Sequence, residues 1–209
     1  FLILCLIFPI MAGMGLNFAM TLGAMAAEIA LIFTADWQIW GIPGIVLAMI
    51  LSIPISVLLG VFCGQILNRA KGKEMITSYM IAFFMDGLYQ LLVLFMMGPV
   101  IPILHSSLRL PRGYGIRNTV SLLHMRQSLD NLGAIHTGGV KIPVLTLAVI
   151  ALFCLFIVWF RKTKLGQDMR AVGQNMDVAR DAGIKVERTR IVAIVMSTVF
   201  AGLGMVIYL

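Results

Sequence analysis

Two acidic residues lie inside apolar runs of this sequence and are its clearest candidates for chemistry. Glu28 stands in AMAAEIALIF, and Asp86 stands in FFMDGLYQLL. A charged group at the centre of a lipid bilayer costs about 2.5–3.5 kcal/mol, so such residues normally face a cavity or a partner. Asn17, Tyr89 and Gln90 are weaker candidates of the same kind. We expect these side chains to line a solute path and to hydrogen-bond hydroxyl or amine groups; the alternative is a purely structural role.

Other reactive residue types show no spacing typical of a site. His105, His124 and His136 are loosely spaced and no HExxH pattern is present, which argues against a metal site. The three cysteines are dispersed through apolar runs, so we assign no disulfide. RAKGKE lacks the first glycine and the final hydroxyl of a Walker A loop, so we expect this chain to bind no nucleotide by that route and no cofactor. We assign no catalytic residue.

The composition identifies the class of fold. Hydrophobic residues make up 60% of the 209 positions and charged residues 12%, and the mean hydropathy is +1.00. Soluble domains carry roughly twice that charged fraction. We therefore predict an all-α, polytopic transmembrane helical bundle. The net charge of +7 falls between the apolar runs, where it indicates membrane orientation rather than nucleic-acid binding.

The apolar runs predict about five to six membrane spans within one transmembrane domain covering residues 1–209. Small residues interrupt the first run, which fits either one span followed by a broken or re-entrant piece, or two short spans. Because the sequence starts and ends inside apolar runs, we expect it to be part of a longer chain with further spans. The runs cover about residues 1–33, 42–67, 75–102, 142–160 and 191–209.

The basic loops predict the orientation. NRAKGKE holds three basic residues against one acid, and segment 161–190 holds eight against four, so both should face the cytoplasm. TADWQIWG and the long connector over residues 103–141 should then face outside. The long connector departs from the rule, because it carries five basic residues against one acid. NTVSLLHMRQSLDNL within it has helical spacing and predicts a short external helix.

The segment GQDMRAVGQNMDVARDAGIKVERTR, from Gly166 to Arg190, is unusually charged for this chain. Its apolar residues recur every three or four positions from Met169 to Ala179, which predicts one amphipathic helix with a single apolar stripe. Gly183 is well placed to end that helix. From spacing alone, the helix could lie on the lipid surface, serve as a solvated connector or dock into a groove of a partner protein.

This segment and the span after it closely resemble the cytoplasmic loop of bacterial ABC importer permeases of the branched-chain amino acid, simple sugar and nucleoside family. About 45 residues carry the resemblance, from KTKLGQDMRAVGQNM to AGLGMV. Two earlier segments agree more loosely with the family: LGAMAAEIAL and GQILNRAKGKEMITSYMIAFFMDGL. This chain departs from the family pattern at AGLGM, where a second Ala-Gly pair is common. The matching positions are Thr163, Gly166, Arg170, Ala171, Val172, Gly173, Asn175, Ala179, Gly183, Ile184 and Val186.

The resemblance implies a role for the loop and a set of partners. In this family the loop is a coupling helix that sits in a cleft of a cytosolic ATP-binding cassette subunit, and its apolar stripe would face that cleft. The implied assembly also contains a second permease subunit, alike or different, and an external solute-binding protein. It lies in the bacterial inner membrane among lipids. The residues expected to couple to the ATPase are Gly166, Arg170, Val172, Gly173, Asn175, Ala179, Gly183 and Ile184.

The expected function is therefore the permease subunit of an ATP-driven importer, with ATP used by a separate subunit. Overall resemblance favours a simple sugar or a nucleoside as solute. Three alternatives remain open from the sequence: a permease for branched-chain amino acids, a secondary transporter driven by an ion gradient, and a membrane enzyme using Glu28 or Asp86 as acid–base groups.

Overall fold

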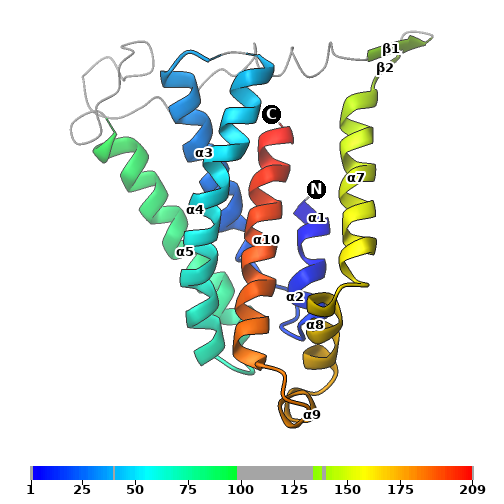
Figure 1. Cartoon of the computed structure of the whole chain (residues 1–209). Helices are drawn as coiled ribbons and strands as arrows, with labels where there is room; N and C mark the ends of the chain where they lie inside the picture. The colour runs from blue at the N-terminus through cyan, green and yellow to red at the C-terminus, as the bar shows by residue number, and fades with distance from the viewer. Residues whose placement is uncertain (1, 40, 98–133, 138–139, 209) are drawn as a thin grey trace.

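The computed structural model describes residues 2–39, 41–97, 134–137 and 140–208. Its helices run roughly along one axis and form a bundle, which confirms the predicted all-α transmembrane class (Figure 1). The helices and strands in chain order are α1 (Leu2–Cys5), α2 (Ile7–Met11), α3 (Met20–Asp36), α4 (Ile42–Arg69), α5 (Glu74–Leu91), the π-helix η1 (Leu92–Met96), β1 (Ala134–Thr137), β2 (Val140–Pro143), α7 (Val144–Phe160), α8 (Lys164–Gln174), α9 (Met176–Asp181) and α10 (Val186–Tyr208).

Helices α3, α4 and α10 form the tightly packed centre of the bundle. Small residues allow this close approach, as expected for helices that pack in a membrane. A Cβ built on Gly23 of α3 would overlap the Thr198 carbonyl of α10, and one built on Gly202 would lie 2.8 Å from the Ser56 hydroxyl of α4. The Thr198 hydroxyl donates a hydrogen bond of 3.1 Å to the Ser56 carbonyl. These contacts hold three helices together with little room for larger side chains.

Three helical stretches in the described residues are long and apolar enough to cross a membrane: α4, α5 continued by η1, and α10. A fourth is added if α7 and α8, which bend by 73° at a short break, count as one span. Each of α3 and α7 has 17 residues. The short antiparallel hairpin of β1 and β2 pairs Ala134 with Pro143, and it is an addition to the predicted all-helical fold.

The two basic loops predicted to be cytoplasmic lie at the same end of the bundle (Figure 1). Lys71, between α4 and α5, forms a 3.7 Å ion pair with Glu187 at the start of α10. The Asn68 side-chain amide donates a 2.9 Å hydrogen bond to the carbonyl of the same Glu187. The turn between α3 and α4, next to Trp37, lies at the opposite end. The helix predicted in the external connector falls outside the described residues.

The first apolar run is interrupted, as both predicted alternatives require, and the structure does not decide between them. Helices α1 and α2 end at Met11, and an irregular segment then leads to α3. Gly13 and Gly15 in this segment have φ angles of 73° and 67°, which glycine adopts without steric cost. The chain reverses there beside α8, so this turn lies at the end of the bundle that holds the basic loops (Figure 1).

Candidate functional site

The charged segment forms two short helices, so the prediction of one continuous helix is wrong. Helix α8 ends at Gln174 and α9 begins at Met176. Asn175 between them has extended backbone angles, φ −156° and ψ 116°. Its side-chain oxygen accepts hydrogen bonds from the backbone N–H groups of Asp177 and Val178, at 2.9 and 3.2 Å. Asn is among the best N-cap residues, and this capping stabilises a new helix start at the cost of continuity.

Both helices have well-defined ends. At the start of α8, the Thr163 hydroxyl accepts a 3.3 Å hydrogen bond from the Gly166 N–H. At the end of α9, Gly183 has a φ of 83°, which confirms its predicted role as a helix stop. The N–H groups of Gly183 and Ile184 donate to the carbonyls of Arg180 and Ala179, as in a Schellman motif.

The apolar stripe of the segment packs inside the chain, which corrects the expectation that it faces a partner. Met169, Val172 and Ala179 are 0%, 1% and 3% exposed. Val172 and Ala179 belong to a small core cluster with Val186 at the start of α10. Burying this stripe removes apolar surface from water. The side of α8 and α9 that stays exposed is therefore the opposite one, which carries the charged residues.

Gly173 marks a close approach between α8 and the end of α2. A Cβ built on Gly173 would overlap the carbonyl oxygen of Met11 and lie 3.1 Å from the Gly13 nitrogen. A Cβ on Gly13 would in turn lie 2.8 Å from the Gly173 Cα. The two glycines thus let the backbones touch, and the position of α8 depends on both.

Exposed polar residues and a few exposed apolar ones make up the solvent-facing side of α8 and α9. Arg170, Gln174 and Arg180 are exposed, and Val178 on α9 is 63% exposed. Exposed apolar and charged residues together suit a protein contact surface, in which burial supplies affinity and charges select the partner. This face, defined by Arg170, Gln174, Val178 and Arg180, is called the outer loop face below.

A buried ion pair ties the loop to α5. Arg190 of α10 is fully buried, and its Nη2 donates to the Glu74 Oε1 at 2.5 Å. Its Nη1 lies 4.0 Å from the Met176 sulfur of α9. Three elements therefore meet at one guanidinium. This pair was not among the residues predicted from the sequence; the available signal was an arginine directly before an apolar span, where a charge needs a partner.

Replacing Asn175 by alanine is expected to loosen α9. Loss of an Asn N-cap costs about 1 kcal/mol, and about 1 kcal/mol corresponds to roughly fivefold faster opening. Hydrogen exchange of the Asp177 and Val178 amides measures this directly. Gln174→Ala, at the exposed neighbouring position, serves as the control. Unchanged exchange in Asn175→Ala would show that the cap contributes nothing.

Four of the five polar residues predicted for the solute path gather between α3 and α5. Asp86 is exposed on α5, and one of its oxygens accepts a 3.2 Å hydrogen bond from the Gln90 amide. Tyr89 of α5 lies within electrostatic range of both the Glu28 carboxylate of α3 and the Asp86 carboxylate. Asn17 stands apart: it is 3% exposed, and its side-chain oxygen accepts a 2.9 Å hydrogen bond from the Ala19 N–H just before α3.

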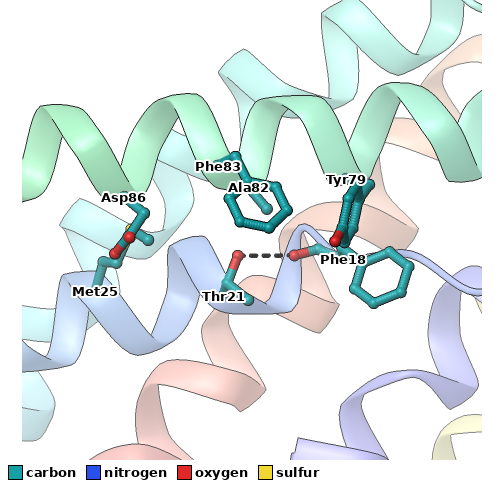
Figure 2. A pocket seen from close by; sticks show the side chains of 7 residues that line it. All are labelled: Phe18, Thr21, Met25, Tyr79, Ala82, Phe83 and Asp86. Atoms are coloured by element: carbon teal, nitrogen blue, oxygen red, sulfur yellow. Dashed lines mark hydrogen bonds between the residues drawn. The ribbon is translucent and has the colours of Figure 1, made fainter.

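A pocket of about 210 Å³ lies beside this cluster (Figure 2). Figure 2 shows Asp86 and Met25 at one end of the pocket and two aromatic rings at the other. The Thr21 hydroxyl donates a 2.8 Å hydrogen bond to the Phe18 carbonyl. The lining residues come from α5, α3 and the segment before α3, and they are Phe18, Thr21, Met25, Tyr79, Ala82, Phe83 and Asp86.

Metal-ligating residues do not cluster in the part of the chain that the structure describes: no group of three His, Cys, Asp or Glu side chains is placed to hold an ion there. His105 and His124 lie outside the described residues, and His136 lies on β1. All three cysteines lie within the described residues and none is in a disulfide; Cys5 and Cys63 are buried, and Cys154 is exposed.

Comparison with known proteins gives a family match over almost the whole chain. The family described as branched-chain amino acid transport system / permease component matches residues 4–209. No solved structure matches significantly.

Three curated relatives are similar over shorter segments. The xylose transport system permease protein XylH of Haemophilus influenzae is 39% identical over 77 residues, 35% of this chain and 20% of that protein. The nucleoside ABC transporter permease protein NupB of Lactococcus lactis is 45% identical over 64 residues, which cover 31% of this chain and 17% of that protein. The probable ABC transporter permease protein YphD of Escherichia coli is 38% identical over 93 residues, which cover 43% of this chain and 27% of that protein. The matches thus span about a quarter of these relatives or less.

Proposed function

This chain belongs to the family of branched-chain amino acid transport system permease components, and on that premise we propose that it is the membrane-spanning permease subunit of an ATP-driven importer. The family match over residues 4–209 carries the proposal. It is supported by the spans of the bundle and by the loop of α8 and α9 at its basic end. The chain forms part of the solute path and takes its energy from a separate subunit.

We propose that a cytosolic ATP-binding cassette subunit docks on the outer loop face. Gly166, Val172, Ala179 and Ile184 are wholly or partly buried in the chain, so they hold the loop in place rather than meet the partner. Gly173 lets α8 approach α2, and Gly183 and Asn175 shape the ends of α9. Arg170 is exposed and contacts the partner directly.

Movement of the docked subunit would reach the spans at both ends of the loop. Helix α8 continues α7 after a 73° bend, and α9 leads into α10. The guanidinium of Arg190 adds a third connection, to Glu74 of α5. A short rigid segment joined in this way transmits a rigid-body displacement to several helices at once.

The rest of the assembly follows from the same proposal. A second permease subunit, alike or different, completes the path, and an external binding protein delivers the solute. The chain lies in the bacterial cell membrane, binds no cofactor itself and leaves ATP to its partner. It has no role in nucleic-acid binding, because its charge is accounted for by membrane orientation and docking.

We infer a simple sugar or a nucleoside as the solute. Two of the relatives are named for xylose and for nucleosides. The family description names branched-chain amino acids, which are the competing solute class.

Reconstitution of the full-length protein with its ATP-binding subunit and binding protein tests the function. ATP-dependent accumulation of solute in proteoliposomes is the expected result. Uptake that instead follows a proton or sodium gradient, without ATP, would overturn the proposal in favour of a secondary transporter. The Walker-A lysine variant of the ATP-binding subunit is the control, because it removes ATP turnover without touching this chain.

Asp86→Asn is expected to reduce uptake more than Glu28→Gln. The Asp86 carboxylate is exposed and lines the pocket, whereas Glu28 is half-buried and lies within electrostatic range of Tyr89. Neutralising Asp86 removes a charge-assisted acceptor, worth about 1.5–3 kcal/mol, or roughly ten- to hundredfold in apparent affinity. Initial uptake rates at several solute concentrations measure the difference. Equal and negligible effects would assign both carboxylates a structural role.

A further inference from the structure

We propose that the turn between α7 and α8 binds the headgroups of anionic phospholipids at the cytoplasmic surface of the membrane. This turn, called the basic elbow below, spans residues 159–165 and carries Trp159, Arg161, Lys162, Lys164 and Leu165. The orientation rests on the importer function proposed above, which places this end of the bundle in the cytoplasm. Lipid bound here would hold the start of the loop on which the ATP-binding subunit docks.

The length of α7 puts the basic elbow at the membrane surface. Helix α7 has 17 residues, none of them charged, and rises about 26 Å at 1.5 Å per residue. This is close to the roughly 30 Å of the hydrocarbon core of a bilayer, so Phe160 at its end lies near the headgroups. Helix α4, with 28 residues, rises about 42 Å and extends past that core. In the view of Figure 1, α7 accordingly ends higher than the lower ends of α4 and α10.

An exposed apolar stripe runs along α7 to the basic elbow. Its exposed residues are Leu152, Leu155, Val158 and Trp159. Because they follow one another at helical spacings of three and four positions, they share one face of the helix. Such a face of a membrane-spanning helix meets lipid chains, and Trp is enriched where the chains give way to headgroups. Trp159 therefore ends the lipid-facing stripe at the depth of the headgroups.

Three cations follow at once on a well-ordered turn. Arg161, Lys162 and Lys164 are exposed, and none of them forms an ion pair with a described residue. Asp168, one turn further along α8, is the next acid in the sequence and forms no such pair either. The Lys162 N–H donates a 3.0 Å hydrogen bond to the Trp159 carbonyl, which fixes the backbone under the cations. A basic residue close to an anionic membrane raises the affinity about fivefold, so the three together select anionic lipid.

The bend after the basic elbow turns the chain along the membrane surface. Helix α8 leaves the axis of α7 at 73°, so with α7 crossing the membrane, α8 runs closer to the membrane plane than to its normal. Leu165, on the first turn of α8, is 47% exposed and directly follows Lys164. An apolar side chain beside cations enters the boundary between headgroups and lipid chains. A dissolved phosphate ion offers nothing to such a side chain, so the basic elbow fits a lipid headgroup.

Quenching of the Trp159 fluorescence by brominated lipids tests the proposal. The full-length protein is reconstituted in equimolar phosphatidylglycerol and phosphatidylcholine, with one or the other lipid brominated. The signal of Trp159 is the difference between the wild-type protein and Trp159→Phe. The elbow variant is Arg161→Gln/Lys162→Gln/Lys164→Gln. The matched control removes the same charge from three other exposed positions at this end of the bundle, and it is Lys73→Gln/Lys185→Gln/Arg188→Gln.

The wild-type protein is expected to bind phosphatidylglycerol at least about fivefold more tightly than phosphatidylcholine at Trp159, since one cation near the surface supplies that factor. The preference should fall to about one in the elbow variant, take an intermediate value in Lys162→Gln alone and stay at the wild-type value in the control.

Three results would overturn the proposal: equal quenching by the two lipids in the wild-type protein, a preference that survives in the elbow variant, or a preference lost equally in the control. A preference that disappears when the ATP-binding subunit is added would also overturn it, because the basic elbow would then belong to the docking surface. ATP-dependent uptake is measured on the same vesicles. Absence of uptake with the lipid preference intact would overturn the importer function and leave the lipid site standing.

Discussion

Gly173→Ala is expected to lower solute uptake by roughly five- to hundredfold while the protein still inserts into the membrane. The new methyl group would overlap the Met11 carbonyl oxygen and press on Gly13. Overpacking of this kind costs about 1–3 kcal/mol, and each 1.4 kcal/mol is a factor of ten in an equilibrium constant. Helix α8 must then move away from α2, which displaces the outer loop face that receives the ATP-binding subunit.

Uptake per amount of inserted protein measures this effect. Gly87→Ala is the matched control, because a Cβ at that helical glycine meets no atom within 4 Å and φ is not positive there. Wild-type uptake in Gly173→Ala would show that the contact between α8 and α2 is not needed for coupling.

Arg190→Ala is expected to destabilise the protein by about 3–5 kcal/mol, because it leaves the Glu74 carboxylate poorly solvated and without its partner. Arg190 is fully buried and the Glu74 side chain is only 12% exposed. The ion pair of Lys71 and Glu187 is the contrast, since its side chains are 42% and 70% exposed. Exposed pairs contribute roughly 0–1 kcal/mol, so Lys71→Ala should change little.

Unfolding of the purified full-length protein in detergent gives the two free-energy changes. The double variant Arg190→Ala/Glu74→Ala should recover part of the loss, because no unpaired carboxylate remains. If Arg190→Ala and Lys71→Ala cost the same, or the double variant is no better than Arg190→Ala, then the buried pair does not hold α10 against α5.

Patterns close together in the sequence predicted the fold well. Long apolar runs indicated the helical bundle, the basic residues around Lys71 and in 161–190 indicated loops at a common end, and Gly183 indicated the helix stop. Each of these signals depends on neighbouring residues and on the chemistry of the bilayer.

Contacts between distant residues could not be predicted in the same way. The periodicity from Met169 to Ala179 fits one helix, and only the capping by Asn175 divides it. Arg190 and Glu74 are separated by 116 positions, so no local pattern links them. The pocket likewise needs α3 and α5 to pack together, and the sequence alone placed Asp86 and Glu28 in different spans without relating them.

A crosslink from the outer loop face tests the central claim most directly. A cysteine replaces Val178, which is 63% exposed on α9, in the full-length chain carrying Cys154→Ser in native membranes, and Leu152→Cys on α7, 67% exposed, is the control in the same background. Mass spectrometry identifies what each cysteine captures. Our account predicts an ATP-binding cassette subunit captured from position 178 and none from position 152. An accessible cysteine at 178 that captures no such subunit would contradict it.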